Sequence, residues 1–182
     1  SGEILWSTAG VLDLVQTISI GDGGNDDLRV GDGQNIVAGG FGQDVIVAGI
    51  DEDLILGDNG AFDYTTTLGV TKLTQANTTD DTATTGVTGD ADIILTGGGT
   101  TANIVLAGLG SDRVNAAARP ATLDPVDVPS AGDDIVIGDN GVVTWDAAGV
   151  MTRFASTQTA QGGDDVIDVG AGDNIVLGGF GA

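Results

Sequence analysis

The chain has 182 residues and a formal net charge of -22, which arises from 27 acidic and 5 basic residues. This charge disfavours nucleic acid and anionic membranes as partners, and the 41% apolar content distinguishes the chain from disordered acidic segments. Because Cys and His are absent, there is no disulfide framework, no common pair of nucleophile and base, and no preferred ligand for zinc or copper. No apolar run reaches the roughly 18 residues of a membrane span. We therefore predict a folded protein that is not an enzyme and does not insert into membranes.

The first predicted element is a β-hairpin in residues 4–15, because alternating apolar residues flank a small turn around Gly10. Trp6 lies on its first strand. We expect residues 1–20 to be the hairpin end of a preceding repeat module.

From residue 21 to residue 60 the sequence repeats every nine residues. Residues 39–47 match the nonapeptide GGxGxDxUx, where U is a large aliphatic residue, and this is a known signature of a calcium-binding parallel β-roll. The acidic or amide position of the four units is occupied by Asp26, Asn35, Asp44 and Asp53. The aliphatic position is occupied by Leu28, Val37, Ile46 and Ile55.

Each unit predicts one short strand and one tight turn. The three residues after the acid or amide are mostly apolar or β-branched, so the middle side chain is expected to point inward. The other six are rich in Gly, Asp and Asn, which tolerate the backbone angles of tight turns. Two units then complete one coil, and residues 18 apart stack at about 4.7 to 4.9 Å.

This stacking predicts calcium. Asp26 would lie over Asp44, and Asn35 over Asp53, and stacked carboxylates repel unless a cation lies between them. Calcium binds oxygen at about 2.3 to 2.6 Å, so two ligands on opposite sides of one ion lie about 4.6 to 5.2 Å apart, close to the strand spacing. Magnesium requires shorter bonds and a stricter octahedron. We therefore expect several calcium ions and a chain that folds only when they are supplied.

The tetrapeptide Gly-Asp-Asn-Gly at residues 57–60 closes the first block of nonapeptides. A second hairpin is predicted in residues 61–73, with its turn at Gly69. Block and hairpin together form the predicted module 1, residues 21–88.

Module 2 is predicted in residues 89–161 and follows the same plan. Its block is closed by a second Gly-Asp-Asn-Gly at residues 138–141, and a hairpin around Gly149 is predicted in residues 142–154. An insertion with all three prolines, residues 115–130, is expected to be a surface loop.

Residues 162–182 are expected to be the truncated start of module 3. An offset of 139 residues superposes them on residues 23–43 without a gap, and it also places Trp6 on Trp145. The modules thus recur at steps of about 70 residues, as in tandem repeat proteins.

Trp6, Tyr64 and Trp145 occupy the same position in the three predicted hairpins. We expect each ring to cover the flank of its own module and shield the core from water. The alternative is a stripe of exposed aromatic rings that binds a ligand.

In these nonapeptides the chain resembles the RTX, or hemolysin-type, calcium-binding repeat family, over residues 21–60, 90–115, 132–141 and 162–182. The resemblance implies an all-β fold, namely a right-handed parallel β-roll solenoid of GGxGxDxUx repeats, here interrupted by β-hairpins. It also implies calcium ligation by Asp side chains and turn carbonyls, and export of the unfolded chain by type I secretion. Asn35, Asn103 and Asn174 depart from the family pattern by losing a charge, so their sites should be weaker or rely on carbonyls. The predicted metal ligands are Asp26, Asn35, Gly40, Gly42, Asp44, Asp51, Asp53, Asp92, Asn103, Gly108, Gly110, Asp112, Asp134, Asp165, Gly170, Gly172 and Asn174.

We predict a calcium-binding structural segment of a large secreted or cell-surface protein, which folds and stiffens on extracellular calcium. An extracellular location is expected because many low-affinity calcium sites fill only outside a cell. The expected partners are calcium and the neighbouring modules of a longer chain, with a surface polysaccharide or a like protein as a further candidate. Two alternatives remain, an adhesive or glycan-binding module and an accessory roll of a secreted enzyme or toxin.

Overall fold

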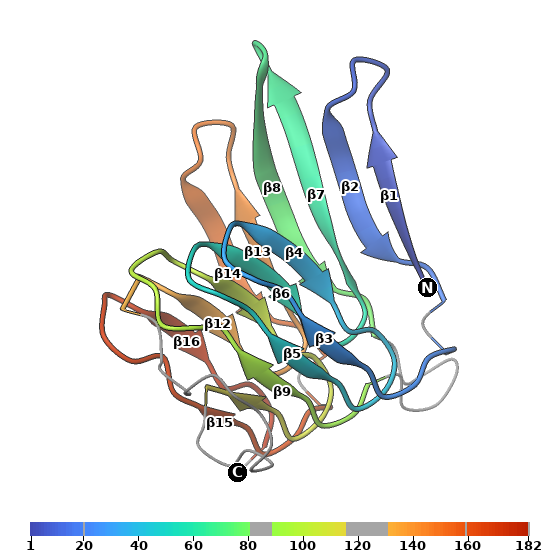
Figure 1. Cartoon of the computed structure of the whole chain (residues 1–182), viewed down its shortest axis with the longest axis vertical. Coiled ribbons are helices and arrows are strands. Elements are labelled where there is room, and N and C mark those ends of the chain that lie inside the picture. Colours follow the sequence, from blue (N-terminus) through green and yellow to red (C-terminus); the bar gives the residue numbers. More distant parts are fainter. Residues whose placement is uncertain (20, 81–88, 116–130, 159, 182) are drawn as a thin grey trace.

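A computed structural model describes residues 1–19, 21–80, 89–115, 131–158 and 160–181. All regular elements in these ranges are β-strands, and they form three sheets. Two sheets are parallel and one is antiparallel (Figure 1). The predicted all-β class is therefore confirmed. The described part of the chain contains no helix that is long and apolar enough to cross a membrane.

The two parallel sheets have five strands each, and the chain alternates between them. Sheet I has the order β15-β11-β9-β5-β3, and sheet II has the order β16-β12-β10-β6-β4. The strands of sheet I are β3 (Asp27–Arg29), β5 (Val45–Val47), β9 (Ile93–Leu95), β11 (Arg113–Val114) and β15 (Val166–Ile167). Those of sheet II are β4 (Asn35–Ala38), β6 (Asp53–Leu56), β10 (Ile104–Leu106), β12 (Ile135–Ile137) and β16 (Ile175–Leu177).

The predicted stacking of residues 18 apart is confirmed in the first block. Leu28 pairs with Ile46 in sheet I, and Val37 pairs with Ile55 in sheet II. The sheets then continue across the interruptions of the repeat, since Ile46 also pairs with Ile94, on the far side of the second hairpin. Strands from both predicted modules thus belong to the same two sheets.

The first apolar cluster combines residues of sheets I and II and lies between them. As predicted, it contains the inward-facing residues of most of these strands, because alternate side chains of a strand point to opposite faces. Its fully or nearly fully buried strand members are Val37, Ile46, Ile55, Ile94, Val105, Val114 and Val136. The exception is β16, whose middle residue Val176 is 40% exposed.

The three predicted hairpins are confirmed, with slightly different boundaries. They are β1 (Gly2–Trp6) with β2 (Leu12–Thr17), β7 (Gly60–Thr67) with β8 (Val70–Thr78), and β13 (Gly141–Trp145) with β14 (Met151–Ser156). They also pair with one another, β2 with β7 and β8 with β13, which the sequence did not predict. The result is sheet III, a six-stranded antiparallel sheet of order β1-β2-β7-β8-β13-β14, whose hairpins β1–β2 and β7–β8 project beyond the parallel strands in Figure 1.

Sheet III packs on the outer face of sheet II through a second apolar cluster. Leu56, Leu106 and Ile137 of sheet II meet Phe62 and Val143 of sheet III in this cluster. Sheet II is therefore apolar on both faces, as is typical of buried parallel strands. By contrast, the outward residues of β3 in sheet I are Asp27 and Arg29, which form an exposed ion pair.

The three aromatic residues of the hairpins differ in burial. Tyr64 and Trp145 pack against the second cluster, as predicted for rings that shield the core. Trp6 is 59% exposed. Each of the three lies at a register shift of its hairpin, so the same bulge recurs in all three.

The predicted proline loop, residues 115–130, lies outside the described residues except for its first position. Asn115 is buried, and its side chain accepts a hydrogen bond from the Thr96 N–H and donates one to the Thr96 hydroxyl. The insertion therefore begins in the packed structure, at the end of β11.

Candidate metal centre

The structure gathers ten of the predicted ligands into two rows. Each parallel strand begins with an Asp or Asn or directly follows one, so the side chains of successive strands stand over one another. Column I, along sheet I, consists of Asp26, Asp44, Asp92, Asp112 and Asp165. Column II, along sheet II, consists of Asn35, Asp53, Asn103, Asp134 and Asn174.

Both columns are held together by one hydrogen-bond pattern, in which each backbone N–H donates to the side-chain Oδ1 of the next member. In column I the donors Asp26, Asp44, Asp92 and Asp112 make bonds of 2.8, 2.7, 2.8 and 2.9 Å. In column II the donors Asn35, Asp53, Asn103 and Asp134 make bonds of 3.0, 3.0, 2.8 and 2.8 Å. Each accepting side chain is therefore held by its Oδ1 atom. In the accepting Asp residues of column I, the second carboxylate oxygen takes no part in this pattern.

In column I the second carboxylate oxygen has no hydrogen-bond partner. This is true of Oδ2 of Asp44, Asp92, Asp112 and Asp165. The first three of these residues are at most 1% exposed. A buried acceptor without a partner costs about 1–3 kcal/mol, and more when it is charged, so buried carboxylates are normally paired or bound to a metal.

Burial and mutual repulsion raise the pKa values along column I. Burial raises the pKa of Asp112 to about 8, and the Asp165 carboxylate adds to the shift. Burial also raises the pKa of Asp165 to about 7, with a further contribution from Asp139. The pKa of Asp92 is raised in the same way, by burial and then by Asp112. These shifts show that the protein alone does not compensate the negative charge of the row.

The orphaned oxygens face the segments that follow the strands of sheet II and lead to sheet I, either directly or through a hairpin of sheet III. We call these segments II-to-I turns. A methyl group on Gly39 would collide with both Asp44 Oδ2 and the carbonyl oxygen of Gly57. A methyl group on Gly57 would collide in the same way with Asp92 Oδ2 and the carbonyl oxygen of Ala107.

The arrangement recurs at Gly138, where the two oxygens are Asp165 Oδ2 and the carbonyl oxygen of Gly178. In all three turns a carboxylate oxygen and a carbonyl oxygen therefore approach one point. Carboxylates and backbone carbonyls are the ligand types that calcium takes from proteins.

The remaining predicted ligands lie in turns. Gly40, Gly42, Gly108 and Gly110 are in II-to-I turns, and all four have positive φ angles, between 98° and 146°. Gly170 and Gly172 lie in the opposite turns, which lead from sheet I to sheet II and are called I-to-II turns, as does Asp51. The Asp51 side chain accepts a hydrogen bond of 3.1 Å from the Gly33 N–H and is exposed.

Asp58 and Asp139 are two buried carboxylates of the II-to-I turns that the sequence interpretation missed. Asp58 accepts hydrogen bonds from the N–H groups of Leu109, at 2.6 Å, and Asp90, at 3.4 Å. Asp139 accepts from Gly163, at 3.0 Å, and from Phe180. Burial and the neighbouring Asp92 raise the pKa of Asp58 far above its usual range.

A sequence signal for these two residues existed. Asp58 stands where the preceding nonapeptides have glycine, and both acids occur in the recurring Gly-Asp-Asn-Gly, which we took only as the end of a block. Their side chains accept hydrogen bonds from the backbone of neighbouring turns. They therefore stabilise the turns that lead into the β7–β8 and β13–β14 hairpins.

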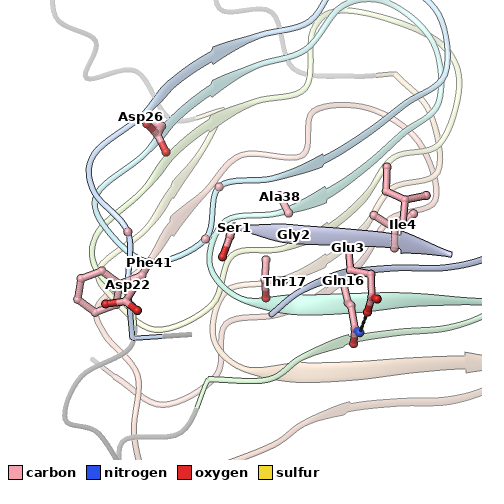
Figure 2. A pocket seen from close by; sticks show the side chains of 14 residues that line it. Ser1, Gly2, Glu3, Ile4, Gln16, Thr17, Asp22, Asp26, Ala38 and Phe41 are labelled. Atoms are coloured by element: carbon pink, nitrogen blue, oxygen red, sulfur yellow. Dashed lines mark hydrogen bonds between the residues drawn. The ribbon is translucent and has the colours of Figure 1, made fainter. Parts of the chain in front are cut away.

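A pocket of about 390 Å³ lies beside the first member of column I, between the β1–β2 hairpin and the first II-to-I turn (Figure 2). Glu3, Asp22 and Asp26 contribute to its lining, and Gln16 Nε2 donates a hydrogen bond of 2.8 Å to Glu3 Oε2. None of the described residues that line it is basic. The pocket therefore does not suit an anionic substrate.

No protein-family model, curated protein or solved structure matches this chain. Within the described ranges, no three acidic side chains form a metal-binding group on their own. A cation in the II-to-I turns would therefore need carbonyl oxygens beside the carboxylates, and the turns supply them. The residues present fit calcium.

Proposed function

We propose that the chain is a calcium-binding structural segment of the RTX type, and that sheets I and II are the two faces of a parallel β-roll, each coil of which contributes one strand to each sheet. The observation that carries this proposal is column I, with its row of buried carboxylate oxygens that lack partners and face turn carbonyls. Supporting it are the nonapeptide signature at residues 39–47 and the 18-residue register of the strands.

Column I couples ligation to folding in this proposal. Asp44, Asp92, Asp112 and Asp165 would offer their Oδ2 atoms, and Gly57, Ala107 and Gly178 their carbonyl oxygens. Calcium, when bound, supplies the positive charge that the buried row lacks. The strands can then pair without mutual repulsion of their carboxylates, and the aliphatic residues between sheets I and II become buried.

We propose a structural role outside the cell, in a secreted or cell-surface protein exported by type I secretion. Sites that fill only at extracellular calcium concentrations would keep the chain unfolded during export and fold it afterwards. The open edge strands β3, β4, β15 and β16 would continue into neighbouring modules. We propose no catalytic role for the segment, because its sequence lacks His and Cys and therefore the common pairs of nucleophile and base.

The experiment is circular dichroism and thermal unfolding of the segment in chelator, in millimolar calcium and in millimolar magnesium. We expect strand signal and a cooperative transition in calcium, and a large loss of both in chelator and in magnesium. A chain that is fully ordered in chelator, with the same unfolding temperature in all three solutions, would disprove the proposed function.

The glycan-binding alternative depends on one observation, the 59% exposure of Trp6. Tyr64 and Trp145 do not extend it into a stripe, because they pack against the second apolar cluster. A glycan array probed with the wild type and with Trp6→Ala separates the alternatives. A scaffold gives no signal that depends on Trp6.

A further inference from the structure

We infer that calcium binds on one side of the two parallel sheets only, in the II-to-I turns. In the I-to-II turns, asparagine side-chain amides donate hydrogen bonds to the oxygens that calcium would otherwise bind. This inference rests on the proposed function and deepens it, because it assigns the cations to one of two outwardly similar rows. It differs from the expectation that both columns bind calcium and that the asparagine sites are weaker.

The clearest case is Asn35 of column II. Its Nδ2 atom donates to the carbonyl oxygens of Gly31, at 2.9 Å, and Gly33, at 2.7 Å, and to Asp53 Oδ1, at 2.9 Å. Two turn carbonyls and one carboxylate thus surround an amide nitrogen. These oxygen types are the ones that calcium binds in proteins. Here they accept hydrogen bonds from the neutral Asn35 amide instead.

The same device recurs along the column. Asn103 Nδ2 donates to Asp134 Oδ1 at 3.1 Å, and Asn174 Nδ2 donates to the carbonyl oxygens of Ala171 and Gly172 at 3.3 and 3.4 Å. Because amides and carboxylates alternate in column II, no two Asp residues are neighbours in it. Every neighbouring pair therefore carries one charge, whereas every pair in column I carries two.

The glycines of the two kinds of turn face different groups. Methyl groups on Gly39, Gly57 and Gly138 of the II-to-I turns would each collide with an orphaned column I carboxylate. Methyl groups on Gly49 and Gly132 of the I-to-II turns would meet only backbone among their nearest atoms, as would those on Gly42 and Gly110 of the II-to-I turns. Both kinds of turn therefore pack backbone on backbone, but Gly39, Gly57 and Gly138 of the II-to-I turns also lie against column I carboxylates, whereas Gly49 and Gly132 do not lie against a column II carboxylate.

Asp53 is the residue of column II that most resembles column I, since it is fully buried and its Oδ2 lacks a hydrogen-bond partner. Both of its column neighbours are amides, Asn35 and Asn103. No second carboxylate of the column is adjacent to share a cation with it. Asp92, an equally buried interior member of column I, lies between the carboxylates of Asp44 and Asp112.

The test counts bound calcium ions per chain for the wild type, Asp92→Asn and Asp53→Asn, by equilibrium dialysis with atomic emission and by native mass spectrometry. The two variants are matched, because each replaces a buried mid-column carboxylate by its amide. We expect Asp92→Asn to lose at least one ion and Asp53→Asn to bind as many ions as the wild type. Asp165→Asn, at the half-buried end of column I, serves the same purpose as Asp92→Asn if the latter does not fold.

The outcomes separate this inference from the function on which it rests. If Asp53→Asn loses as many ions as Asp92→Asn or Asp165→Asn, calcium binds on both sides and the inference is wrong, while the proposed function stands. A wild-type chain that binds no calcium at millimolar concentration overturns the proposed function itself.

Discussion

Asp92 and Asp53 are both interior members of their columns in the two parallel sheets. Each is at most 1% exposed, each accepts a backbone N–H at Oδ1, and each has an Oδ2 atom without a hydrogen-bond partner. Their column neighbours differ, because Asp92 lies between two carboxylates and Asp53 lies between two amides. The need for a cation is therefore a property of the row, and not of the single residue.

The same contrast explains how one nonapeptide unit serves two purposes. In the proposed function, a row of like charges would make assembly of sheet I depend on an external ion, since the charges repel until they are neutralised. An alternating row stabilises sheet II from within, because each amide donates to a carboxylate or to turn carbonyls. In this proposal the stability of column I depends on bound calcium, whereas column II is stabilised by its own amides.

The largest expected effect is the loss of calcium stabilisation when column I is neutralised. We expect Asp92→Asn/Asp112→Asn to lose most of the rise in unfolding temperature that calcium produces in the wild type, and Asp53→Asn/Asp134→Asn to keep most of it. Each site contributes about 2.7 kcal/mol at a calcium concentration one hundred times its Kd. Thermal unfolding in chelator and in calcium measures the difference, and equal losses in the two double variants would contradict the contrast between the columns.

The next effect concerns pH in the absence of calcium. The pKa values of Asp112 and Asp165 are raised in the folded chain, to about 8 and about 7, from about 4 in the unfolded chain. The folded state therefore binds more protons, so its stability is greatest below pH 4 and falls as the pH rises through 7 and 8.

We therefore expect the calcium-free chain to show more strand signal and a higher unfolding temperature at pH 5 than at pH 8.5, where little of it folds, and the stability of the calcium-bound chain to depend less on pH. Thermal unfolding followed by circular dichroism across this range measures both. A calcium-free chain whose stability increases from pH 5 to pH 8.5 would show that column I is not the dominant charge cluster. Asp112→Asn is the control, and its pH dependence should be smaller than that of the wild type.

A smaller effect is expected when column II is given the charge pattern of column I. Asn103→Asp places three carboxylates in a row, with Asp53 and Asp134, and removes the 3.1 Å bond to Asp134. At a calcium concentration just sufficient to fold the wild type, we expect a loss of about 3–5 kcal/mol, the usual effect of an uncompensated buried charge. Denaturant unfolding measures it, and excess calcium should restore part of it. Stability equal to that of the wild type at the lower calcium concentration would mean that the amides do not balance the charge of column II.

Much of this arrangement was predictable from the sequence. The nine-residue period predicted the strands of the first block, their inward residues and four column members, Asp26, Asn35, Asp44 and Asp53, because side-chain direction follows strand periodicity. The other six members were predicted from the resemblance to the RTX family. The hairpins were also predicted, since an alternating apolar pattern around a glycine turn is a local signal.

The pairing of the hairpins into sheet III was not predictable in the same way. Leu14 pairs with Asp63, and Val143 pairs with Ala76, so these contacts join segments far apart in the sequence. An alternating pattern shows which residues of a strand face the core, but it does not name the neighbouring strand. The function of Asp58 was missed for a related reason, since its partner Leu109 lies 51 residues away.

The meaning of the asparagines also depended on the structure. Their interval to the next column member grows from 18 residues, for Asn35, to 31 residues, for Asn103, because insertions of different length separate the strands. The sequence alone predicted that each asparagine is a calcium site with one negative charge fewer than an aspartate site. Only the donor geometry of Asn35 shows that its amide holds the turn oxygens itself.

The smallest expected effect comes from a methyl group placed in one kind of turn or the other. Gly57→Ala would collide with Asp92 Oδ2 and the Ala107 carbonyl oxygen, whereas Gly31→Ala, in an I-to-II turn, has no other atom within 4 Å of the added carbon. We expect Gly57→Ala to cost about 1–3 kcal/mol, as overpacked sites do, and Gly31→Ala to change stability by less than about 0.5 kcal/mol. Denaturant unfolding in saturating calcium gives both values, and calcium titration should show weaker binding for Gly57→Ala alone. Equal affinity in the two variants would mean that the point between Asp92 and Ala107 is not where a cation binds, because the methyl group fills that point in one variant only.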